Sequence, residues 1–478
     1  MRGGAGASGK KRAARSRGAV PKRGFAQFNT AYRWLLERTN VERLRPSRVD
    51  QSMFKLERMS ALMERLGNPQ ESLRCVHVAG TNGKGSVVAM LRAALTRAGA
   101  ATGAYTSPHL MNVRERITVG GELVSEESFA DLVSRVGREA EAIGRQKNDL
   151  GEATFFEIMT AMAFLHFAEQ AVDVAIVEVG MGGRLDATNV ITPEVSVITK
   201  IGLDHQSFLG ETVEEIAAEK AGIMKEGVPV LTLQQEKGVE AVLRERAEDV
   251  GTTLEVLGKE IEYSQRFESD PKLGPHMRIG VTSGGRGFEH VAVPLAGEHQ
   301  APNCGLALAV LGKLAGLGME LRELDVVDGL AETRVPGRME IIGERPRVLL
   351  DGAHNPESLG ALVKAVGAHV PYDSMVVVFG CAGDKPVDGL LEQVEKIGDK
   401  VIFTRAKGNP RAADPEDLAE RFRGRSSKMV QVAPTLEEAM AIARRATGRD
   451  DLVCVTGSFY LVGEARKLLL SEPALSRG

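Results

Sequence analysis

The chain has few cysteines, few aromatic residues and no long apolar run among its 478 residues. Its four cysteines lack the paired spacing of a zinc site, so we expect reduced, mostly buried side chains without disulfides. No stretch approaches the roughly 18 apolar residues of a membrane helix. The N-terminus also lacks the apolar core of a secretory signal. These absences predict a soluble protein of the cytoplasm that has no membrane partner.

The chain does contain enough apolar residues, 43% of the total, to fill the cores of two large α/β domains. Its basic residues are unevenly placed, because residues 1–23 carry eight of them and no acid. This composition predicts a disordered, solvated tail, with weak nucleic-acid contact or organelle targeting as alternatives. The net charge of −3 includes this tail, so the rest of the chain is more acidic and is not expected to bind nucleic acid generally.

From Phe25 onward, strand-like and helix-like segments alternate, which is typical of parallel sheets joined by crossover helices. Between Leu233 and Leu295 the pattern is less regular, and its glycines indicate turn-rich β structure. A second α/β series follows. The ten expected strands are Cys75–Val78, Thr102–Thr106, Val174–Val179, Val195–Thr199 and Val228–Leu233, then Arg347–Leu350, Met375–Phe379, Lys400–Phe403, Met429–Val432 and Leu452–Val455.

A Pro336-Gly337 pair interrupts both patterns, so we place a domain boundary near Arg334 to Pro336. The expected organisation is therefore a basic tail over residues 1–23, a first α/β domain over residues 24–334 and a second over residues 335–478.

The segment Val76–Ser86 places a glycine-rich turn and Lys84 between an apolar strand and the helical run Val87–Ala98. Backbone N–H groups of such a turn, the positive end of the helix and the lysine together favour a nucleotide triphosphate. The spacing is unusual, because Gly80 and Gly83 lie closer than in the common phosphate loop and a further glycine precedes Ser86. A chance glycine turn is the alternative.

Three strand ends carry possible Mg²⁺ ligands, namely Ser107, Glu178 and His205. Ligands of parallel sheets collect at these ends, and a hydroxyl, a carboxylate and an imidazole can share a Mg²⁺ shell with phosphates and waters. Each residue alone also fits a structural role as a turn cap, an ion-pair partner or a satisfied loop histidine. The glycine-rich segment Glu178–Asn189, which adds Arg184 as an anion clamp, favours a working site.

Taken together, these segments resemble the folylpolyglutamate synthase and dihydrofolate synthase family, a branch of the Mur ligase superfamily, from about Phe28 to Arg466. Its usual phosphate loop, Gly-Thr-Asn-Gly-Lys-Gly-Ser, accounts for the compressed spacing. The matching segments are Leu56–Met59, Gly80–Ser86, Thr106–Leu110, Glu178–Asp186, Asp204–His205, Glu219–Ile223, Gly297–Asn303, Pro336–Arg338, Asp351–Pro356 and Thr456–Glu464. The resemblance implies an N-terminal P-loop ATPase domain of the Mur ligase central type, with a parallel sheet, and a C-terminal Rossmann-like α/β domain.

The reaction implied by the resemblance couples ATP to amide formation in folate biosynthesis. The γ-phosphoryl group of ATP moves to a carboxylate of the acceptor, and the amino group of L-glutamate attacks the resulting acyl phosphate. The acceptor is dihydropteroate, tetrahydrofolate with its polyglutamates, or both. Because many bacterial members are bifunctional, we expect both acceptors, and we expect a monomer.

The resemblance also implies residue roles. Lys84, His205 and Lys220 would be catalytic, and Ser107, Glu178 and His205 would bind Mg²⁺. The lysine matching Lys220 is carbamylated in this family and would bind a second Mg²⁺ or orient the acyl phosphate, whereas by itself it reads as a surface lysine of the helix Val213–Met224. The ATP-binding residues would be Thr81, Asn82, Gly83, Lys84, Gly85, Ser86, Asn303, Arg338, Asp351 and His354.

Within that ATP set, Asn303 would face the adenine, Arg338 would contact phosphate, and Asp351 with His354 would reach the ribose and phosphate. Domain closure would then assemble the site.

Two positions depart from the family pattern, since Val335 replaces an aromatic residue and Pro386 replaces a second Asp after Asp384-Lys385. Two other functions also remain as alternatives. One is a Mur-type ligase acting on a different carboxylate. The other is a binding protein in which ATP only orders the domains and the basic tail holds nucleic acid.

Overall fold

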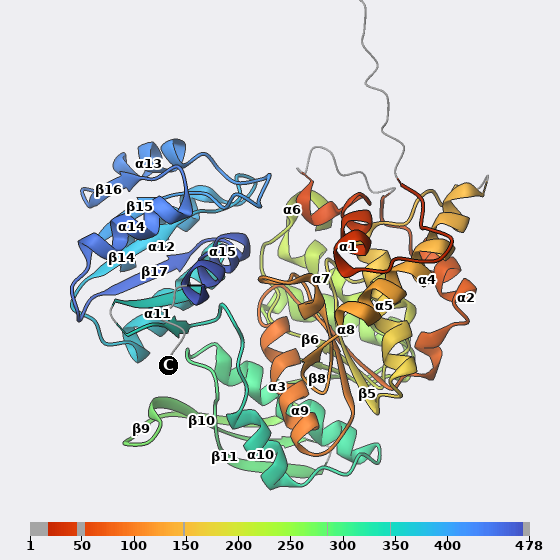
Figure 1. The fold of residues 1–478 in the computed structure, drawn as a ribbon. Coiled ribbons are helices and arrows are strands. Elements are labelled where there is room, and N and C mark those ends of the chain that lie inside the picture. Colours follow the sequence, from red (N-terminus) through yellow and green to blue (C-terminus); the bar gives the residue numbers. More distant parts are fainter. Residues whose placement is uncertain (1–17, 45–52, 147–148, 284, 345, 472–478) are drawn as a thin grey trace, which may run out of the picture.

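The computed structural model describes residues 18–44, 53–146, 149–283, 285–344 and 346–471. It contains two mixed α/β units, each built on its own sheet, and a small antiparallel ribbon beside them (Figure 1). The expected α/β class with two sheets is therefore confirmed.

The first sheet has eight strands in the order β4-β3-β2-β5-β1-β6-β7-β8. Neighbours from β2 to β8 run parallel, whereas β3 and β4 form an antiparallel hairpin at one edge. β1 and β5 are buried along their whole length, which explains their continuous apolar sequences. The strands are β1 (Cys75–Ala79), β2 (Thr102–Tyr105), β3 (Ile117–Val119), β4 (Glu122–Leu123), β5 (Val174–Glu178), β6 (Val195–Ile198), β7 (Val230–Thr232) and β8 (Leu254–Val256).

Helices cover both faces of this sheet. One core cluster joins α3, α9 and α10 to alternate residues such as Val76 and Val78 of β1, while Cys75 belongs to the opposite cluster with α1, α2, α4 and α5. The helices are α1 (Phe28–Leu36), α2 (Leu56–Arg65), α3 (Lys84–Arg97), α4 (Glu126–Arg145), α5 (Phe155–Glu169), α6 (Gln206–Leu209), α7 (Val213–Ala221), α8 (Lys237–Val250), α9 (Gln300–Gly316) and α10 (Glu323–Ala331). The carboxyl ends of β1, β5 and β6 thus meet at one edge between two helical layers.

The second sheet has six strands in the order β12-β13-β17-β14-β15-β16, all parallel except β12. Three of its strands have the predicted bounds. The strands are β12 (Glu340–Ile342), β13 (Arg347–Asp351), β14 (Met375–Phe379), β15 (Lys400–Phe403), β16 (Met429–Val432) and β17 (Leu452–Thr456). The helices are α11 (Pro356–His369), α12 (Val387–Ile397), α13 (Pro415–Arg423), α14 (Leu436–Ala446) and α15 (Phe459–Leu470).

The irregular region after Leu233 contains the expected β structure, an antiparallel ribbon of β9 (Glu262–Asp270), β10 (Gly274–Ser283) and β11 (Arg286–Ala292). It also contains α8 and β8, which the sequence pattern did not predict. The ribbon contacts the end of α11, because the His369 ring accepts a hydrogen bond from Gly297 N–H at 3.2 Å and donates one to Pro275 O at 3.0 Å.

The start of the described chain packs against the first domain. Trp34 Nε1 donates to Gly18 O at 2.7 Å, and Val20 N–H donates to Glu141 at 2.7 Å. Gly18 and Val20 belong to the segment that the sequence predicted as a disordered tail, but they are packed against the first domain. Residues 1–17 of that tail lie outside the described residues.

The four cysteines are buried and free, as the sequence predicted. Among the described helices, none is long and apolar enough to cross a membrane.

Candidate functional site

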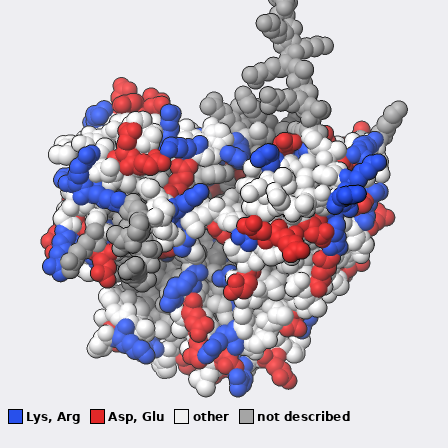
Figure 2. All heavy atoms as spheres, in the orientation of Figure 1, with Lys and Arg blue, Asp and Glu red and all other residues white. Residues whose placement is uncertain are grey.

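A cleft of about 1290 Å³ is lined by the strand ends of both sheets and by the segment that joins them. Its walls include the glycine-rich turn after β1, the carboxyl end of β5, the loop after β6 and the start of α11. On the face seen in Figure 2, basic and acidic side chains are interspersed over both parts of the molecule. The predicted ATP-binding, metal-binding and catalytic residues all line this one cleft. Arg184, the expected anion clamp, does not line it, because its guanidinium pairs with Glu219 at 2.7 Å instead.

The turn between β1 and α3 requires glycine for steric reasons. Gly80 and Gly83 adopt φ values of +146° and +95°. A Cβ atom at Gly80 would lie 1.8 Å from Thr199 Oγ1, and one at Gly83 would lie 2.6 Å from Asn303 Oδ1. The tight turn thus brings the start of α3 against β6 and α9.

Backbone amides divide between two roles in this turn. The N–H groups of Thr81 and Asn82 donate to Lys200 O at 2.9 and 3.2 Å. The first helical bond of α3 runs from Val87 N–H to Gly83 O, so the amides before it lie at the orphan end of the helix. The amides suited to an anion are therefore those of the first turn of α3, whereas the amides of Thr81 and Asn82 fix the loop.

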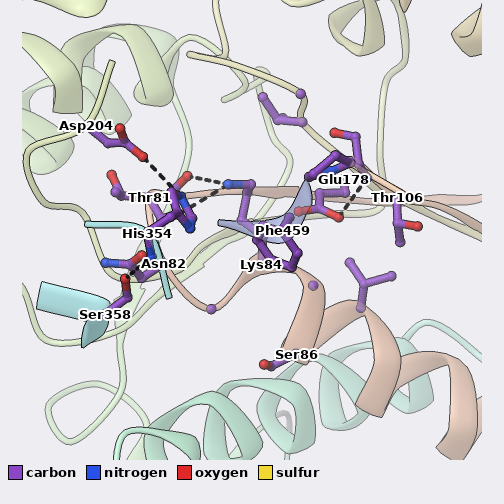
Figure 3. A pocket seen from close by; sticks show the side chains of 18 of the residues that line it. Thr81, Asn82, Lys84, Ser86, Thr106, Glu178, Asp204, His354, Ser358 and Phe459 are labelled. Atoms are coloured by element: carbon purple, nitrogen blue, oxygen red, sulfur yellow. Dashed lines mark hydrogen bonds and ion pairs between the residues drawn. The ribbon is translucent and has the colours of Figure 1, made fainter. Parts of the chain in front are cut away.

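Lys84 and Lys220 converge on the same loop carbonyl. Lys84 Nζ donates to Gly80 O at 3.0 Å and to Thr81 O at 3.3 Å, as Figure 3 shows beside Glu178. Lys220 Nζ donates to Gly80 O at 3.0 Å, and its residue is only 4% exposed. The alternative interpretation of Lys220 as a surface lysine is wrong. Burial, with the charge of Lys84 second, lowers the pKa of Lys220 to about 7.

Ser107 and Glu178 lie together at the ends of β2 and β5. Glu178 is 4% exposed and accepts a hydrogen bond from Ser107 N–H at 3.2 Å. A Cβ atom at Gly85 would lie 4.0 Å from Glu178 Oε2, so this carboxylate faces the first turn of α3. Burial raises the pKa of Glu178, although Lys84 opposes the effect. The arrangement puts a poorly solvated carboxylate beside the predicted phosphate site.

His205 begins the short helix α6 with a left-handed backbone, φ +52°, and its side chain keeps 35% exposure. Its Nε2 lies 3.8 Å from Asp204 Oδ2. Desolvation by the surrounding walls of the cleft lowers the pKa of His205 to about 3, so the ring is neutral, which is its metal-binding form. Within the described residues, no three His, Cys, Asp or Glu side chains form a metal cluster by themselves. The predicted metal ligands Ser107, Glu178 and His205 include a hydroxyl, so they are not a cluster of this kind.

The second domain contributes Arg338, Asp351 and His354. Asp351 accepts hydrogen bonds from Met339 N–H at 3.0 Å and Ala353 N–H at 2.9 Å, and lies 4.0 Å from Arg338 Nη1. The Arg338 guanidinium sits over the Phe459 ring, 4.5 Å from its centre. These contacts fix a cation and a carboxylate at the carboxyl end of β13.

Asn303, expected near the adenine, is buried on α9. Its Nδ2 donates to Gln300 Oε1 at 3.1 Å, and its Oδ1 is the atom that a Cβ on Gly83 would meet. Asn303 therefore lies directly against the glycine-rich turn.

Polar side chains connect the two domains across the cleft. His354 Nδ1–H donates to Gly352 O at 2.9 Å, which leaves its Nε2 3.6 Å from Asp204 Oδ2 (Figure 3). Lys385 contacts the other oxygen of Asp204. Burial alone would raise the pKa of Asp204, but the nearby His205, His354 and Lys385 hold that pKa well below its usual range. Asp204 thus accepts contacts from two elements of the second domain.

A second bridge involves Glu357, which sequence reasoning missed. Asn82 Nδ2 donates to Glu357 Oε2 at 2.9 Å, and Asn355 Nδ2 donates to Asn82 Oδ1 at 3.2 Å. The only sequence signal for Glu357 is its place directly after Asn355-Pro356, at the start of α11. The bridge ties the phosphate loop to the first turn of a helix in the other domain.

Sequence reasoning also missed a buried ion pair beneath the cleft. Arg116, 1% exposed, donates to both carboxylate oxygens of Glu42 at 2.8 and 2.6 Å and to His109 Nδ1 at 2.9 Å. Burial would raise the pKa of Glu42, but the Arg116 guanidinium holds it below its usual value. Arg411 of the second domain donates to Glu42 O at 2.9 Å, so this pair also lies at the domain junction.

Comparison with known proteins agrees with this arrangement. Residues 78–311 match the Mur ligase middle domain, and residues 337–459 match the Mur ligase glutamate ligase domain. A Bacillus subtilis protein named dihydrofolate synthase/folylpolyglutamate synthase is 36% identical over 416 residues, which cover 87% of this chain and 94% of the relative.

Solved structures give the same result. Mycobacterium tuberculosis folylpolyglutamate synthase complexed with ADP has a TM-score of 0.83 at 34% identity, covering 93% of this chain and 99% of that one. Escherichia coli FolC in complex with DHPP and ADP has a TM-score of 0.78 at 29% identity, covering 93% and 97%.

Proposed function

Because this chain belongs to the folylpolyglutamate synthase/dihydrofolate synthase family of the Mur ligase superfamily, we propose that it is a bifunctional member that glutamylates both dihydropteroate and tetrahydrofolate. The chain is an ATP-dependent glutamate ligase of folate metabolism, and a Mur-type ligase for a different carboxylate is not favoured. The observation that carries the proposal is the single cleft that holds the phosphate loop, Glu178 and the Asp351–His354 segment together.

Lys84 and the first amides of α3 would hold the β- and γ-phosphates of ATP. Their support is the orphan end of α3 and the position of the Lys84 amine at the loop. Arg338, with Asp351 and His354, would bind the nucleotide from the second domain, and Asn303 would face its adenine. An uphill amide bond becomes accessible because the carboxylate oxygen leaves as phosphate after the glutamate amine attacks.

Ser107, Glu178 and His205 fit a Mg²⁺ site. Glu178 is a buried carboxylate that accepts a hydrogen bond from the Ser107 amide, and His205 is neutral, so both can donate electron pairs to a hard cation. When bound there, Mg²⁺ would neutralise charge on the phosphate oxygens.

Lys220 would be carbamylated, as the resemblance implied. A pKa of about 7 leaves much of its amine neutral near neutral pH, which is the form that attacks carbon dioxide. The new N–C bond releases a proton and replaces a buried cation by an anion. That anion, beside Gly80, would bind a second Mg²⁺ or orient the acyl phosphate.

We also propose a cytoplasmic monomer without membrane or nucleic-acid partners. The acidic balance of the chain outside residues 1–23 supports the lack of a nucleic-acid partner.

The test measures phosphate release from ATP, Mg²⁺ and L-glutamate with dihydropteroate, with tetrahydrofolate and with no acceptor, and identifies the products by mass. Release with both acceptors, each gaining one glutamyl unit, is the expected result. Release with one acceptor would reject bifunctionality. No coupled release with either would reject the proposal.

A further inference from the structure

One arm of the cleft runs along α3 toward the β3–β4 hairpin. This α3 arm is lined by Ala89, Arg92, Thr118, Leu123 and Arg334. Arg92 and Arg334 also line a neighbouring hollow of about 430 Å³, together with residues of the hairpin turn. Because the two arginines border both spaces, they lie at the same end of the cleft.

Arg92 is partly buried and, unlike the neighbouring Arg97, has no acidic partner within the described residues. Burial lowers the pKa of Arg92, and within the described residues no hydrogen bond or ion pair to it is found. By contrast, Arg97, five residues onward in the same helix, lies 3.7 Å from Asp328 and 3.9 Å from Glu332. Arg92 is therefore a desolvated cation whose charge no described acid contacts.

Neighbouring polar groups share this lack of partners. Thr118, 4% exposed, and Thr96 have buried hydroxyls without a hydrogen-bond partner in the described chain. Thr118 lines the cleft and Thr96 lines the neighbouring hollow. Arg334 donates only to the carbonyls of Ala331 and Thr333, at 3.1 and 2.8 Å, and so retains its charge. Buried polar groups normally have partners, so this cluster suits a polar, anionic ligand.

The place of the α3 arm limits which anion fits. Arg92 follows Lys84 by eight residues in one helix, which is about 12 Å along its axis. A γ-linked glutamyl unit spans five backbone bonds, roughly 6 Å when extended. An acceptor that reacts near Lys84 and extends along α3 would therefore place carboxylates of earlier glutamyl units near Arg92.

We propose that the α3 arm binds the α-carboxylates of glutamyl residues already attached to the acceptor, with Arg92 as the main anchor and Arg334 beside it. The inference rests on the proposed function, because it assumes that folate polyglutamates are substrates. Arg92 and Arg334 would set the preference for the length of the glutamyl chain, and they would take no part in the chemical step. Arginine suits this role because its planar guanidinium pairs with carboxylate through two parallel hydrogen bonds.

The experiment measures KM and kcat for dihydropteroate and for tetrahydrofolate with one, two and three glutamates, using wild type, Arg92→Gln and Arg334→Gln. Arg97→Gln is the matched control, because it removes a neighbouring arginine that is already paired. In Arg92→Gln we expect KM for the triglutamate to rise about tenfold, with a smaller rise for the diglutamate and the smallest for dihydropteroate. Arg334→Gln should show the same trend more weakly, and Arg92→Lys should restore part of the loss.

Binding without turnover separates the role from a folding defect. The triglutamate should lose affinity for Arg92→Gln at a melting temperature close to that of wild type, and inorganic phosphate should not compete with it. Equal losses for all acceptors, or none, would overturn the inference, and competition by phosphate would make the arm a general anion site instead. A wild-type enzyme that glutamylates neither acceptor would instead reject the proposed function.

Discussion

At the scale of single residues, Glu178 is the side chain whose environment is hardest to explain without a ligand. It is a buried carboxylate at a strand end, it accepts one amide hydrogen bond, and it faces the first turn of α3. A structural carboxylate at this depth would ordinarily have a cation as a full partner. Arg58 and Glu157 illustrate that other case, because their side chains are joined at 2.9 Å and both are buried.

Glu178→Gln should therefore lower kcat at least a hundredfold while keeping the fold, because the amide cannot supply the charge that a Mg²⁺ ligand supplies. Glutamylation should be followed over a Mg²⁺ titration, with melting temperature as the folding check. The amide variant should melt at or above the wild-type temperature, since it removes a charge whose burial raises the pKa of Glu178. Activity near wild type at every Mg²⁺ concentration would remove Glu178 from the site.

Lys220 gives a prediction about pH. Burial lowers the pKa of Lys220 to about 7, whereas the unfolded chain keeps a pKa near the usual 10.5. Between these values the unfolded state binds the extra proton, so this group makes stability rise with pH, by at most about 1.4 kcal/mol per pH unit. Below the folded pKa the contribution is flat, because both states are protonated.

Replacing the amine removes this dependence. In carbon dioxide-free buffer, Lys220→Met should lose the rise in stability from pH 7 to pH 9 that wild type shows, as measured by urea unfolding. Identical slopes in the two proteins would show that Lys220 is not buried as an amine. Lys220→Ala should also be inactive and partly recovered by added short carboxylic acids, and full activity of wild type without bicarbonate would argue against carbamylation.

At the scale of elements, the turn between β1 and α3 is the part most dependent on glycine. Gly83 and Gly99 have almost the same backbone angle, φ +95° and +94°, but only Gly83 has a neighbour where a Cβ would stand. Changing either to alanine should cost about 1–2 kcal/mol of stability from the left-handed backbone. Only Gly83→Ala should also weaken ATP binding, because it displaces Asn303.

Gly99→Ala is the control for Gly83→Ala, because the two glycines share almost the same backbone angle. Urea unfolding measures the loss of stability that the two variants share. Equilibrium binding of a nonhydrolysable ATP analogue measures the difference in affinity between them. We expect at least a tenfold weaker affinity for Gly83→Ala and an unchanged one for Gly99→Ala. Equal affinities would mean that the contact with Asn303 does not shape the nucleotide site.

The elements also show what sequence can and cannot predict. β14 and β15 were predicted with their observed bounds because buried parallel strands are continuous apolar runs. The strand-end residues Ser107 and Glu178 were found for a related reason, since parallel topology gathers carboxyl ends at one edge. α8 was missed because its charged sequence buries only Val239, Leu243 and Ala247.

Pairs between distant segments left no local signal. Arg116 and Glu42 stand 74 positions apart, and Asn82 and Glu357 stand 275 apart. No periodicity or spacing within one segment can indicate which charge will meet which, so the ion pair and the bridge between domains required the folded chain. The cluster around Arg92 was missed likewise, because an unpaired arginine looks like any surface arginine in sequence.

At the scale of the whole molecule, the two domains meet through apolar packing, as where Leu110 packs against the core of the second domain, and through several polar contacts. The polar contacts include the bridge from Asn82 to Glu357 and Asn355, the contacts of Asp204 with His354 and Lys385, and Arg411 with the Glu42 carbonyl. Interfaces between domains that include such polar contacts permit relative domain motion. The bridge at Asn82 differs from the others because Asn82 itself belongs to the loop that we propose binds the phosphates. ATP binding and domain approach would then be joined at one side chain.

Glu357→Ala should therefore loosen the closed arrangement and weaken ATP binding together. Burial raises the pKa of Glu357, and Asn82 is its hydrogen-bond partner, so the variant removes a bridge and also relieves a poorly solvated carboxylate. We expect a larger radius of gyration by solution X-ray scattering without nucleotide, a KM for ATP raised several-fold and a smaller change in kcat. Glu392→Ala is the control, because Glu392, in the described part of the chain, pairs with Lys396 of the same helix, far from the bridge. If scattering and KM for Glu357→Ala match that control, the bridge does not couple ATP to closure, and the remaining contacts at Asp204 must do so.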